Sequence, residues 1–127
     1  MRILLIILLA ATAQADKLLD AMAQVESGGD CNAVGDYDAK TKTYRAIGCL
    51  QIWPITVKDC NRIIGRNKYT LADRYDRQKS YEMAGIIRKH YCKTDDEFIR
   101  RWKTGTNKPT KAGEIYRRKV KAEYEKR

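Results

Sequence analysis

Apolar residues recur at three- to four-residue spacing through most of this chain, and glycine, proline and capping residues divide the pattern into segments. This spacing puts the apolar side chains on one face of an α-helix. Helices are therefore predicted at five places: 16–27, 54–64, about 76–91, from the capping box at 94–97, and after the loop at 105–110. A chain of 127 residues has room for one core, so a single, mainly helical domain is expected.

Glycine and proline give the main signals at the helix ends. Gly28-Gly29 should stop the first helix, and Pro54 suits the first turn of the second, which Gly65 should end. A capping box formed by Thr56 and Asp59 is an alternative start for that second helix. The residues expected by helical period to face the core are Leu18, Leu19, Met22, Val25, Ile55, Val57, Ile63, Ile64, Met83, Ala84, Ile87, Tyr91, Phe98, Ile99, Trp102, Ala112, Tyr116, Val120 and Tyr124.

Residues 30–48 interrupt the helical pattern. This stretch is polar and contains Gly35 and Gly48. It predicts a loop and a short β-hairpin whose turn falls near 38–42, although no Asn-Gly or Asp-Gly pair marks the turn. The expected class is therefore α+β, a helical domain with one small hairpin.

The first 15 residues have the features of a secretory signal peptide. A basic start at Arg2 precedes the apolar run 3–11, and Ala13-Gln14-Ala15 is a small-x-small cleavage pattern. The run is shorter than the roughly 20 apolar residues that span a bilayer. We therefore expect export to a secreted or periplasmic location, with the mature domain at 16–127. A retained signal-anchor and an N-terminal core helix are the alternatives.

Cys31, Cys49, Cys60 and Cys92 form an even set of cysteines in a small chain that is expected to be exported. Two disulfides are the default for such a set. Three pairings are open, and 31–49 with 60–92 is preferred. No CxxC spacing occurs and His90 is the single histidine, so no metal site is expected.

The chain is strongly basic, with 26 Lys and Arg against 16 Asp and Glu. Removing residues 1–15 removes one Arg and no acid, which leaves 25 basic and 16 acidic residues, a net charge of +9. This charge favours a polyanion, such as nucleic acid, an anionic membrane surface or an acidic cell-wall polymer. Export, and the spread of Lys and Arg over several predicted helix faces, argue against nucleic acid. A basic surface with no specific partner is the plain alternative.

Glu26 is a carboxyl in an unusual place. It lies four positions after Met22 and seven after Leu19, so it projects from the apolar face of the first helix, near its end. Desolvation and the negative end of the helix dipole both raise the pKa of a carboxyl there, toward the range that a general acid needs. A Glu that points into water from the last helical turn is the ordinary alternative.

Several motifs follow one another in a familiar order. Glu26-Ser27-Gly28-Gly29 is followed by Gly48-Cys49-Leu50-Gln51-Ile52 and by Pro54-x-Thr56. Near the C-terminus come Arg101-Trp102-Lys103-Thr104-Gly105 and Tyr116-Arg117-Arg118-Lys119-Val120. The set resembles the lysozyme-like superfamily of lytic transglycosylases (SLT-type) and goose-type lysozymes, over nearly all of residues 16–127. The resemblance implies a lysozyme-like fold in which the hairpin forms one wall of an active-site cleft.

The resemblance also implies a peptidoglycan-degrading glycosidase. Glu26 would protonate the oxygen between N-acetylmuramic acid and N-acetylglucosamine, with no cofactor. The Gln51 amide can donate and accept, which suits an N-acetyl sugar, although a buried structural glutamine is the alternative. The substrate-binding residues implied are Ser27, Gly48, Gln51, Ile52, Tyr91, Trp102 and Tyr116. The expected partner is the bacterial cell wall, bound by a monomer.

Asp36 decides the expected product. It resembles an aspartate of goose-type lysozymes that activates water, and inverting hydrolysis places the two carboxyls about 6.5–9.5 Å apart. If Asp36 caps the hairpin instead, Glu26 would act as acid and then as base, and the sugar 6-hydroxyl would form a 1,6-anhydro product.

Two residues depart from the family pattern. Lys103 replaces its Asn, which puts one substrate contact in doubt, and Trp53, taken as a core residue, stands where goose-type lysozymes have a further Asp. The rival to the enzyme is a non-catalytic cationic wall-binding or antimicrobial protein on the same scaffold. The wall binding of such a protein would survive Glu26→Gln.

Overall fold

The computed structural model describes residues 17–127 as five α-helices, a short 3-10 helix and a two-stranded antiparallel hairpin. The predicted α+β class is confirmed. The first helix covers residues 17–27. The other elements are β1 (Val34–Asp38), β2 (Thr43–Ile47), α2 (Pro54–Ile64), η1 (Leu71–Tyr75), α3 (Arg77–Tyr91), α4 (Asp95–Thr104) and α5 (Lys111–Glu125).

The predicted signal peptide at 1–15 lies outside the described residues. Within residues 17–127, no helix combines the length and the apolar character needed to cross a membrane.

Local signals set the helix boundaries. Gly28 and Gly29 have left-handed φ angles of 67° and 80°, and their N–H groups donate to carbonyls of the last helical turn, which ends the first helix. α2 begins at Pro54 and ends before Gly65, whose φ is 76°. The alternative start at a Thr56–Asp59 capping box is wrong, because proline at the first helical position has no N–H to satisfy and already has a helical φ.

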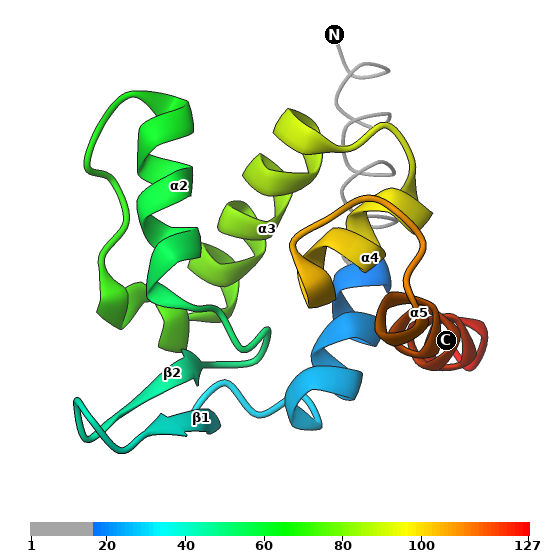
Figure 1. The fold of residues 1–127 in the computed structure, drawn as a ribbon, viewed down its shortest axis with the longest axis horizontal. Helices are drawn as coiled ribbons and strands as arrows, with labels where there is room; N and C mark the ends of the chain where they lie inside the picture. The colour runs from blue at the N-terminus through cyan, green and yellow to red at the C-terminus, as the bar shows by residue number, and fades with distance from the viewer. Residues whose placement is uncertain (1–16) are drawn as a thin grey trace, which may run out of the picture.

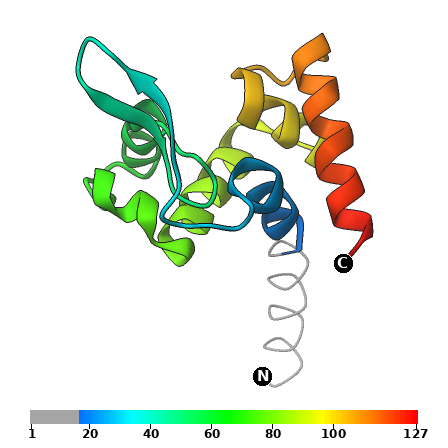
Figure 2. The same ribbon diagram turned by 90° about the horizontal axis from the view of Figure 1, so that it is seen from below.

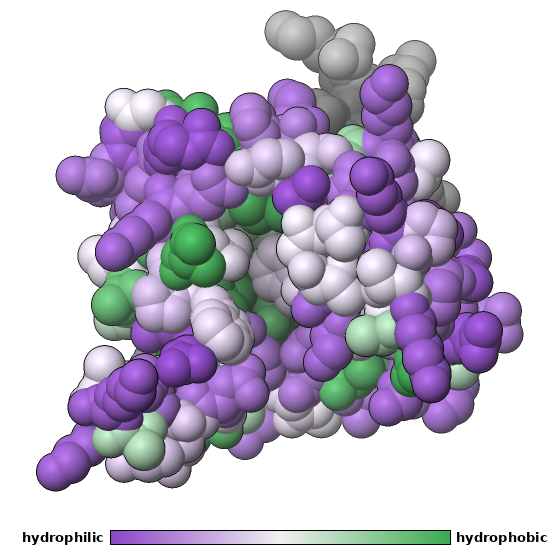
Figure 3. Space-filling view, in the orientation of Figure 1, coloured by the Kyte–Doolittle hydropathy of each residue, from purple (hydrophilic) through white to green (hydrophobic). Residues whose placement is uncertain are grey.

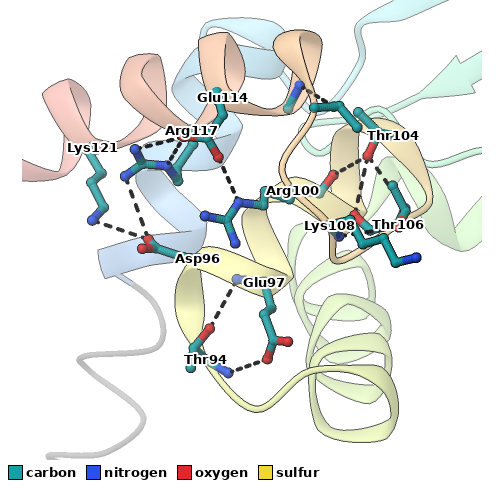
Figure 4. Close-up of polar contacts among 12 residues, drawn as sticks. Thr94, Asp96, Glu97, Arg100, Thr104, Thr106, Lys108, Glu114, Arg117 and Lys121 are labelled. Carbon is teal, nitrogen blue, oxygen red and sulfur yellow. Dashed lines mark hydrogen bonds and ion pairs between the residues drawn. The ribbon is translucent and has the colours of Figure 1, made fainter.

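Capping and ion pairs fix the two C-terminal helices. Thr94 Oγ1 accepts from Glu97 N across 3.2 Å, and Glu97 Oε1 accepts from Thr94 N across 3.2 Å, so the predicted capping box opens α4. Figure 4 shows the ion pairs that join α4 to α5. Arg100 Nε donates to one oxygen of Glu114 across 2.7 Å, and Arg117 Nη2 lies 2.9 Å from the other.

The hairpin forms where it was predicted. β1 and β2 pair with Asp38 opposite Thr43, and Asp38 Oδ1 accepts from Lys40 N across 3.0 Å to hold the turn. At the other end of β2, a bridge between Ile47 and Ile52 joins the hairpin to the segment before α2.

Most of the predicted inward-facing residues are buried or half-buried, and two are exposed. Ile55 is 71% exposed, and Ala112 is exposed on α5. The buried positions of α5 are Gly113, Tyr116 and Val120, so the inward face begins one residue later than predicted. The buried apolar cluster comprises Leu18, Leu19, Ala21, Met22, Ala23, Cys49, Leu50, Ile52, Val57, Cys60, Tyr69, Met83, Ala84, Ile87, Phe98, Ile99, Tyr116 and Val120.

The 3-10 helix η1, which was not predicted, carries the buried Arg74. Arg74 Nη1 donates to Arg45 O across 2.9 Å and to Ile52 O across 3.0 Å. Its Nε donates to Leu71 O across 2.8 Å. Gly48 packs against the same residue: a Cβ there would lie 1.8 Å from Arg74 O, and its φ is 89°. Only glycine fits this approach.

Figure 1 shows α3 in the middle of the molecule, between two groups of elements. The hairpin, α2 and η1 lie on one side, and the first helix, α4 and α5 lie on the other, as Figure 2 shows from below. Between the two sides the surface is hollowed, and apolar atoms are visible in the hollow (Figure 3). The fold therefore brings the helix that ends near Glu26 to one edge of a depression.

Candidate active-site cleft

A cleft of about 990 Å³ opens between the two sides of the molecule. Sites for small ligands are usually about 300–1,000 Å³, so this cleft is among the large ones. Its walls come from the first helix, the hairpin, the turn before α2, α2 itself, α3 and α4. Of the predicted site residues, Glu26, Asp36, Gln51, Ile52, Tyr91 and Trp102 line it, whereas Ser27, Gly48 and Tyr116 do not.

Glu26 is half-buried at the end of the first helix, in the wall of the cleft. Burial raises the pKa of its carboxyl above the ordinary 4.5, because desolvation disfavours the charged form. The Tyr116 hydroxyl and the Lys103 ammonium oppose this rise, and the Asp36 carboxylate adds to it. Burial is therefore the main cause of a pKa shift in the direction that a general acid needs.

Tyr116 approaches Glu26 from α5. Its side chain is 4% exposed, and its hydroxyl has no hydrogen-bond partner among the residues that the structure describes. Burial and the charge of Glu26 raise the pKa of this hydroxyl well above its usual range. The two groups are thus close enough to influence each other without forming a hydrogen bond of ordinary geometry. A buried hydroxyl without a partner is uncommon, and a small movement would let it donate to the carboxylate.

Asp36 lines the cleft from β1. It is exposed, has a left-handed φ of 52°, and occupies a position of β1 that is not paired with β2. Asp38, and not Asp36, accepts the hydrogen bond that holds the hairpin turn. The two carboxyls named from the sequence therefore share one cleft, with different environments.

Gln51 is held by the backbone while it lines the cleft. Its Nε2 donates to Gly48 O across 2.9 Å and to Ala33 O across 3.2 Å, and its φ is 53°. A Cβ at Gly35 would lie 2.6 Å from Gln51 Oε1, so the glycine makes room for this amide. The amide nitrogen of Gln51 therefore has a structural role, as the alternative predicted, although the side chain also borders the cleft.

Trp102 and Tyr91 each combine packing with exposure to the cleft. Trp102 Nε1 donates to Leu50 O across 3.1 Å, and its ring lies 5.8 Å from that of Phe98. The Tyr91 hydroxyl donates to Asp59 Oδ2 across 2.7 Å. Both side chains are half-buried. Each one therefore packs partly against the core, as its helical period predicts, and partly borders the cleft, as the resemblance implies.

Sequence reasoning missed the α2 wall of the cleft. Ile55, Asp59 and Arg62 line it, and their i, i+4, i+7 spacing would have indicated a common helix face. Trp53, taken as a core residue, is 38% exposed and also lines the cleft. The guanidinium of Arg45 lies 5.4 Å from the Trp53 ring.

All four cysteines carry free thiols in the structure. Burial and the neighbouring thiol of Cys31 together raise the pKa of Cys49 to about 12, so these two thiols lie together. Cys60 Sγ donates to Met83 O across 3.4 Å, whereas Cys92 Sγ donates to Asn107 Oδ1 across 3.6 Å. The structure thus brings together the first preferred pair and directs the members of the second toward different partners.

Within residues 17–127, no group of three or more His, Cys, Asp or Glu side chains is placed to hold a metal ion. Neither a family model, nor a curated protein, nor a solved structure matches this chain. The chemistry of the site therefore carries the information about function.

Proposed function

We propose that this protein is a peptidoglycan-degrading glycosidase, a lytic transglycosylase or lysozyme, with Glu26 as general acid. One observation carries the proposal: a carboxyl with a pKa raised by burial lies in the wall of a large cleft that a second carboxyl, Asp36, also lines. Cleavage of a glycosidic bond uses two carboxyls in different environments. The order of the motifs supplies the substrate class and suggests a lysozyme-like arrangement, with the hairpin and α2 opposite α4.

Glu26 would donate its proton to the oxygen between N-acetylmuramic acid and N-acetylglucosamine. The carboxylate left behind needs stabilisation at that moment. Lys103 and Tyr116 supply it, because both lower the pKa of Glu26 and so favour its charged form. Burial favours the protonated form of Glu26 before the reaction, and these two neighbours favour the carboxylate that forms when the proton is transferred.

The second step determines the product. In hydrolysis, Asp36 takes a proton from water, and the hydroxide adds to the muramic acid C1. In the lytic route, the 6-hydroxyl of the same sugar attacks C1 and gives its proton to the Glu26 carboxylate. The exposed Asp36, whose side chain is not used to hold the hairpin turn, favours the hydrolytic route.

The charge of the chain fits a wall-degrading role outside the cell. The net charge of +9 without residues 1–15 would concentrate the protein on an anionic wall or membrane surface and would make its activity fall with added salt. A secreted or periplasmic location is part of the same proposal.

Digestion of purified peptidoglycan, with mass analysis of the released muropeptides, tests the proposal. The wild-type protein should release them, and Glu26→Gln should lower the rate by about 100-fold or more, the usual contribution of a general acid. Glu125→Gln, at an exposed position near the end of α5, is the matched control and should keep full activity. A product with a reducing muramic acid means a lysozyme, and one lighter by a water means a transglycosylase.

Two results would contradict the proposal. If the wild-type protein releases no muropeptide, it is not a peptidoglycan-degrading glycosidase. If the Glu26→Gln variant keeps full activity, another residue is the general acid. Wall binding that survives Glu26→Gln, in a protein that releases nothing, supports the non-catalytic cationic binder instead.

A further inference from the structure

One cation in the cleft is held in place with no carboxylate of the described residues beside it. Lys58, Arg62, Arg101 and Lys103 all line the cleft. Asp59 neutralises Arg62, with 2.6 Å between Arg62 Nη2 and Asp59 Oδ1. Lys103 acts on Glu26, since its charge lowers the pKa of that carboxyl. Neither Arg101 nor Lys58 forms an ion pair with a carboxylate of residues 17–127, but the exposed Lys58 side chain has no hydrogen bond within those residues to hold it in place.

Arg101 is nevertheless ordered by its neighbours. Its Nε donates to Asn107 Oδ1 across 2.5 Å, and its guanidinium lies 4.2 Å from the centre of the Tyr91 ring. Asn107 Nδ2 in turn donates to Tyr91 O across 2.8 Å. The hydroxyl of Tyr91 is fixed by Asp59. The side chain of Arg101 therefore has a defined position at the α3 end of the cleft.

Other half-buried or buried arginines in this protein have partners that explain them. Arg74 uses its donors on three backbone carbonyls. Arg100 and Arg117 both meet Glu114 (Figure 4). Arg101 is half-buried and stacked, yet no carboxylate in the described part of the chain pairs with it. Because desolvating a guanidinium without an anion costs free energy, such a residue is favourable mainly when a ligand supplies the anion.

We propose that Arg101 binds a carboxylate of the substrate. The planar guanidinium matches a carboxylate with two parallel hydrogen bonds, and stacking on Tyr91 orients it for that contact. Arg101 and Lys103 are two positions apart on α4 and point in different directions, toward Tyr91 and toward Tyr116. The carboxylate is therefore bound beside the cleavage point and not at it.

This inference rests on the proposed function and narrows its substrate. A glycan chain of N-acetylglucosamine alone carries no carboxylate. In peptidoglycan, muramic acid carries a lactyl group that ends in a carboxyl. This carboxyl is free in the peptide-free sugar. In the intact wall it is joined to the peptide, and the peptide then supplies carboxylates of its own. We assign the Arg101 contact to a carboxylate of the attached peptide.

Binding to the full chain carrying Glu26→Gln, which prevents turnover, tests the site by calorimetry. Three ligands separate the sources of the carboxylate: a chitin oligosaccharide with none, a peptide-free muramic acid oligosaccharide with the lactyl carboxylate, and the same oligosaccharide with its peptides. The peptide-bearing ligand should bind on the order of tenfold more tightly than the chitin oligosaccharide, as expected for hydrogen bonds to a charged group. Adding Arg101→Gln should remove that difference.

Two further variants keep the result interpretable. Arg101→Lys retains the charge but not the two parallel hydrogen bonds, so it should keep part of the difference in affinity. Arg118→Gln removes one positive charge at an exposed position of α5 and should keep the whole difference in affinity. The melting temperature of each variant shows whether it is folded.

Equal affinities for all three ligands would overturn the proposal. So would an Arg101→Gln variant whose affinity falls by the same factor for each ligand. If the peptide-free muramic acid oligosaccharide binds as tightly as the peptide-bearing one, the assignment to the peptide is overturned, and a carboxylate site at Arg101 is supported. The binding result is independent of turnover. If wild-type protein cleaves peptidoglycan but shows no preference for a carboxylate, the Arg101 inference fails and the proposed function stands.

Discussion

Ser27 Oγ donates a hydrogen bond to Cys49 O across 2.8 Å, and so joins the residue after Glu26 to the turn before Gln51. The same Oγ lies 3.1 Å from Ala23 O, but the hydroxyl has one proton, and the shorter contact takes it. This bond links two parts of the candidate site that are 22 positions apart in the sequence.

Ser27→Ala should therefore lower the free energy of unfolding by about 1 kcal/mol, the usual net value of one hydrogen bond. It should reduce kcat more than it changes KM, because it loosens the support of Glu26 without removing a group from the cleft. Thr41→Ala at the exposed hairpin turn is the control and should cost less than about 0.5 kcal/mol. A large rise in KM for Ser27→Ala would instead support the substrate-binding role predicted from the sequence.

The neighbours of Glu26 should shift its pKa in opposite directions. Lys103→Gln and Tyr116→Phe each remove a group that lowers the pKa of Glu26, so both should raise it. Asp36→Asn removes a carboxylate that raises the pKa, so it should lower it. Titration of the Glu26 carboxyl by NMR measures the shifts directly, and the alkaline limb of the pH–activity profile should move with them. Shifts of one sign in all three variants would contradict this electrostatic account of the site.

Glu26→Gln should make the folded protein more stable at neutral pH. The pKa of Glu26 is raised in the folded state, so stability is lost as pH rises from the ordinary pKa of 4.5 toward the raised pKa, and the full cost of the buried carboxylate remains at higher pH. Gln has no such penalty. Below about the ordinary pKa of 4.5, Glu26 is protonated in both states and the two proteins should have the same stability. Denaturant unfolding at both pH values measures the difference, and a stability gain that persists at low pH would point to packing instead.

Oxidation should join Cys31 to Cys49. Their thiols already lie together, and a disulfide would close the loop that carries Asp36. Loops of about 15 residues gain roughly 3 kcal/mol from such a bond in the chain-entropy description. Peptide mapping of the oxidised protein should find this pair, with Cys60 and Cys92 recovered as thiols. A linkage between Cys60 and Cys92 would show that the preferred sequence pairing was right for both bridges.

The helix boundaries followed from the sequence because their signals act over a few residues. Gly28 and Gly65 end helices through their own backbone conformation, and Thr94 caps α4 through a bond to a residue three positions away. The hairpin was placed by the polar interruption between two helical patterns. The helix face of Glu26 came from the same local information, through its position relative to Leu19 and Met22, whereas its role as the acid was predicted from the order of the motifs along the chain.

The charges around Glu26 could not be read from local patterns. Tyr116 is 90 positions away in the sequence and Lys103 is 77, and both reach Glu26 through the packing of α4 and α5. Arg74 was missed for the same reason, since the carbonyls that satisfy it belong to distant segments.

The sequence by itself determined the α-helices, the hairpin and the place of one acid on the apolar side of its helix, because hydrophobic period and capping depend on neighbours along the chain. Only the tertiary structure decided which groups face that acid, that Ile55 is exposed at the cleft and not in the core, and that Arg101 forms no ion pair with a carboxylate of residues 17–127. Burial and charge balance are sums over residues that folding brings together, and no local pattern contains those sums.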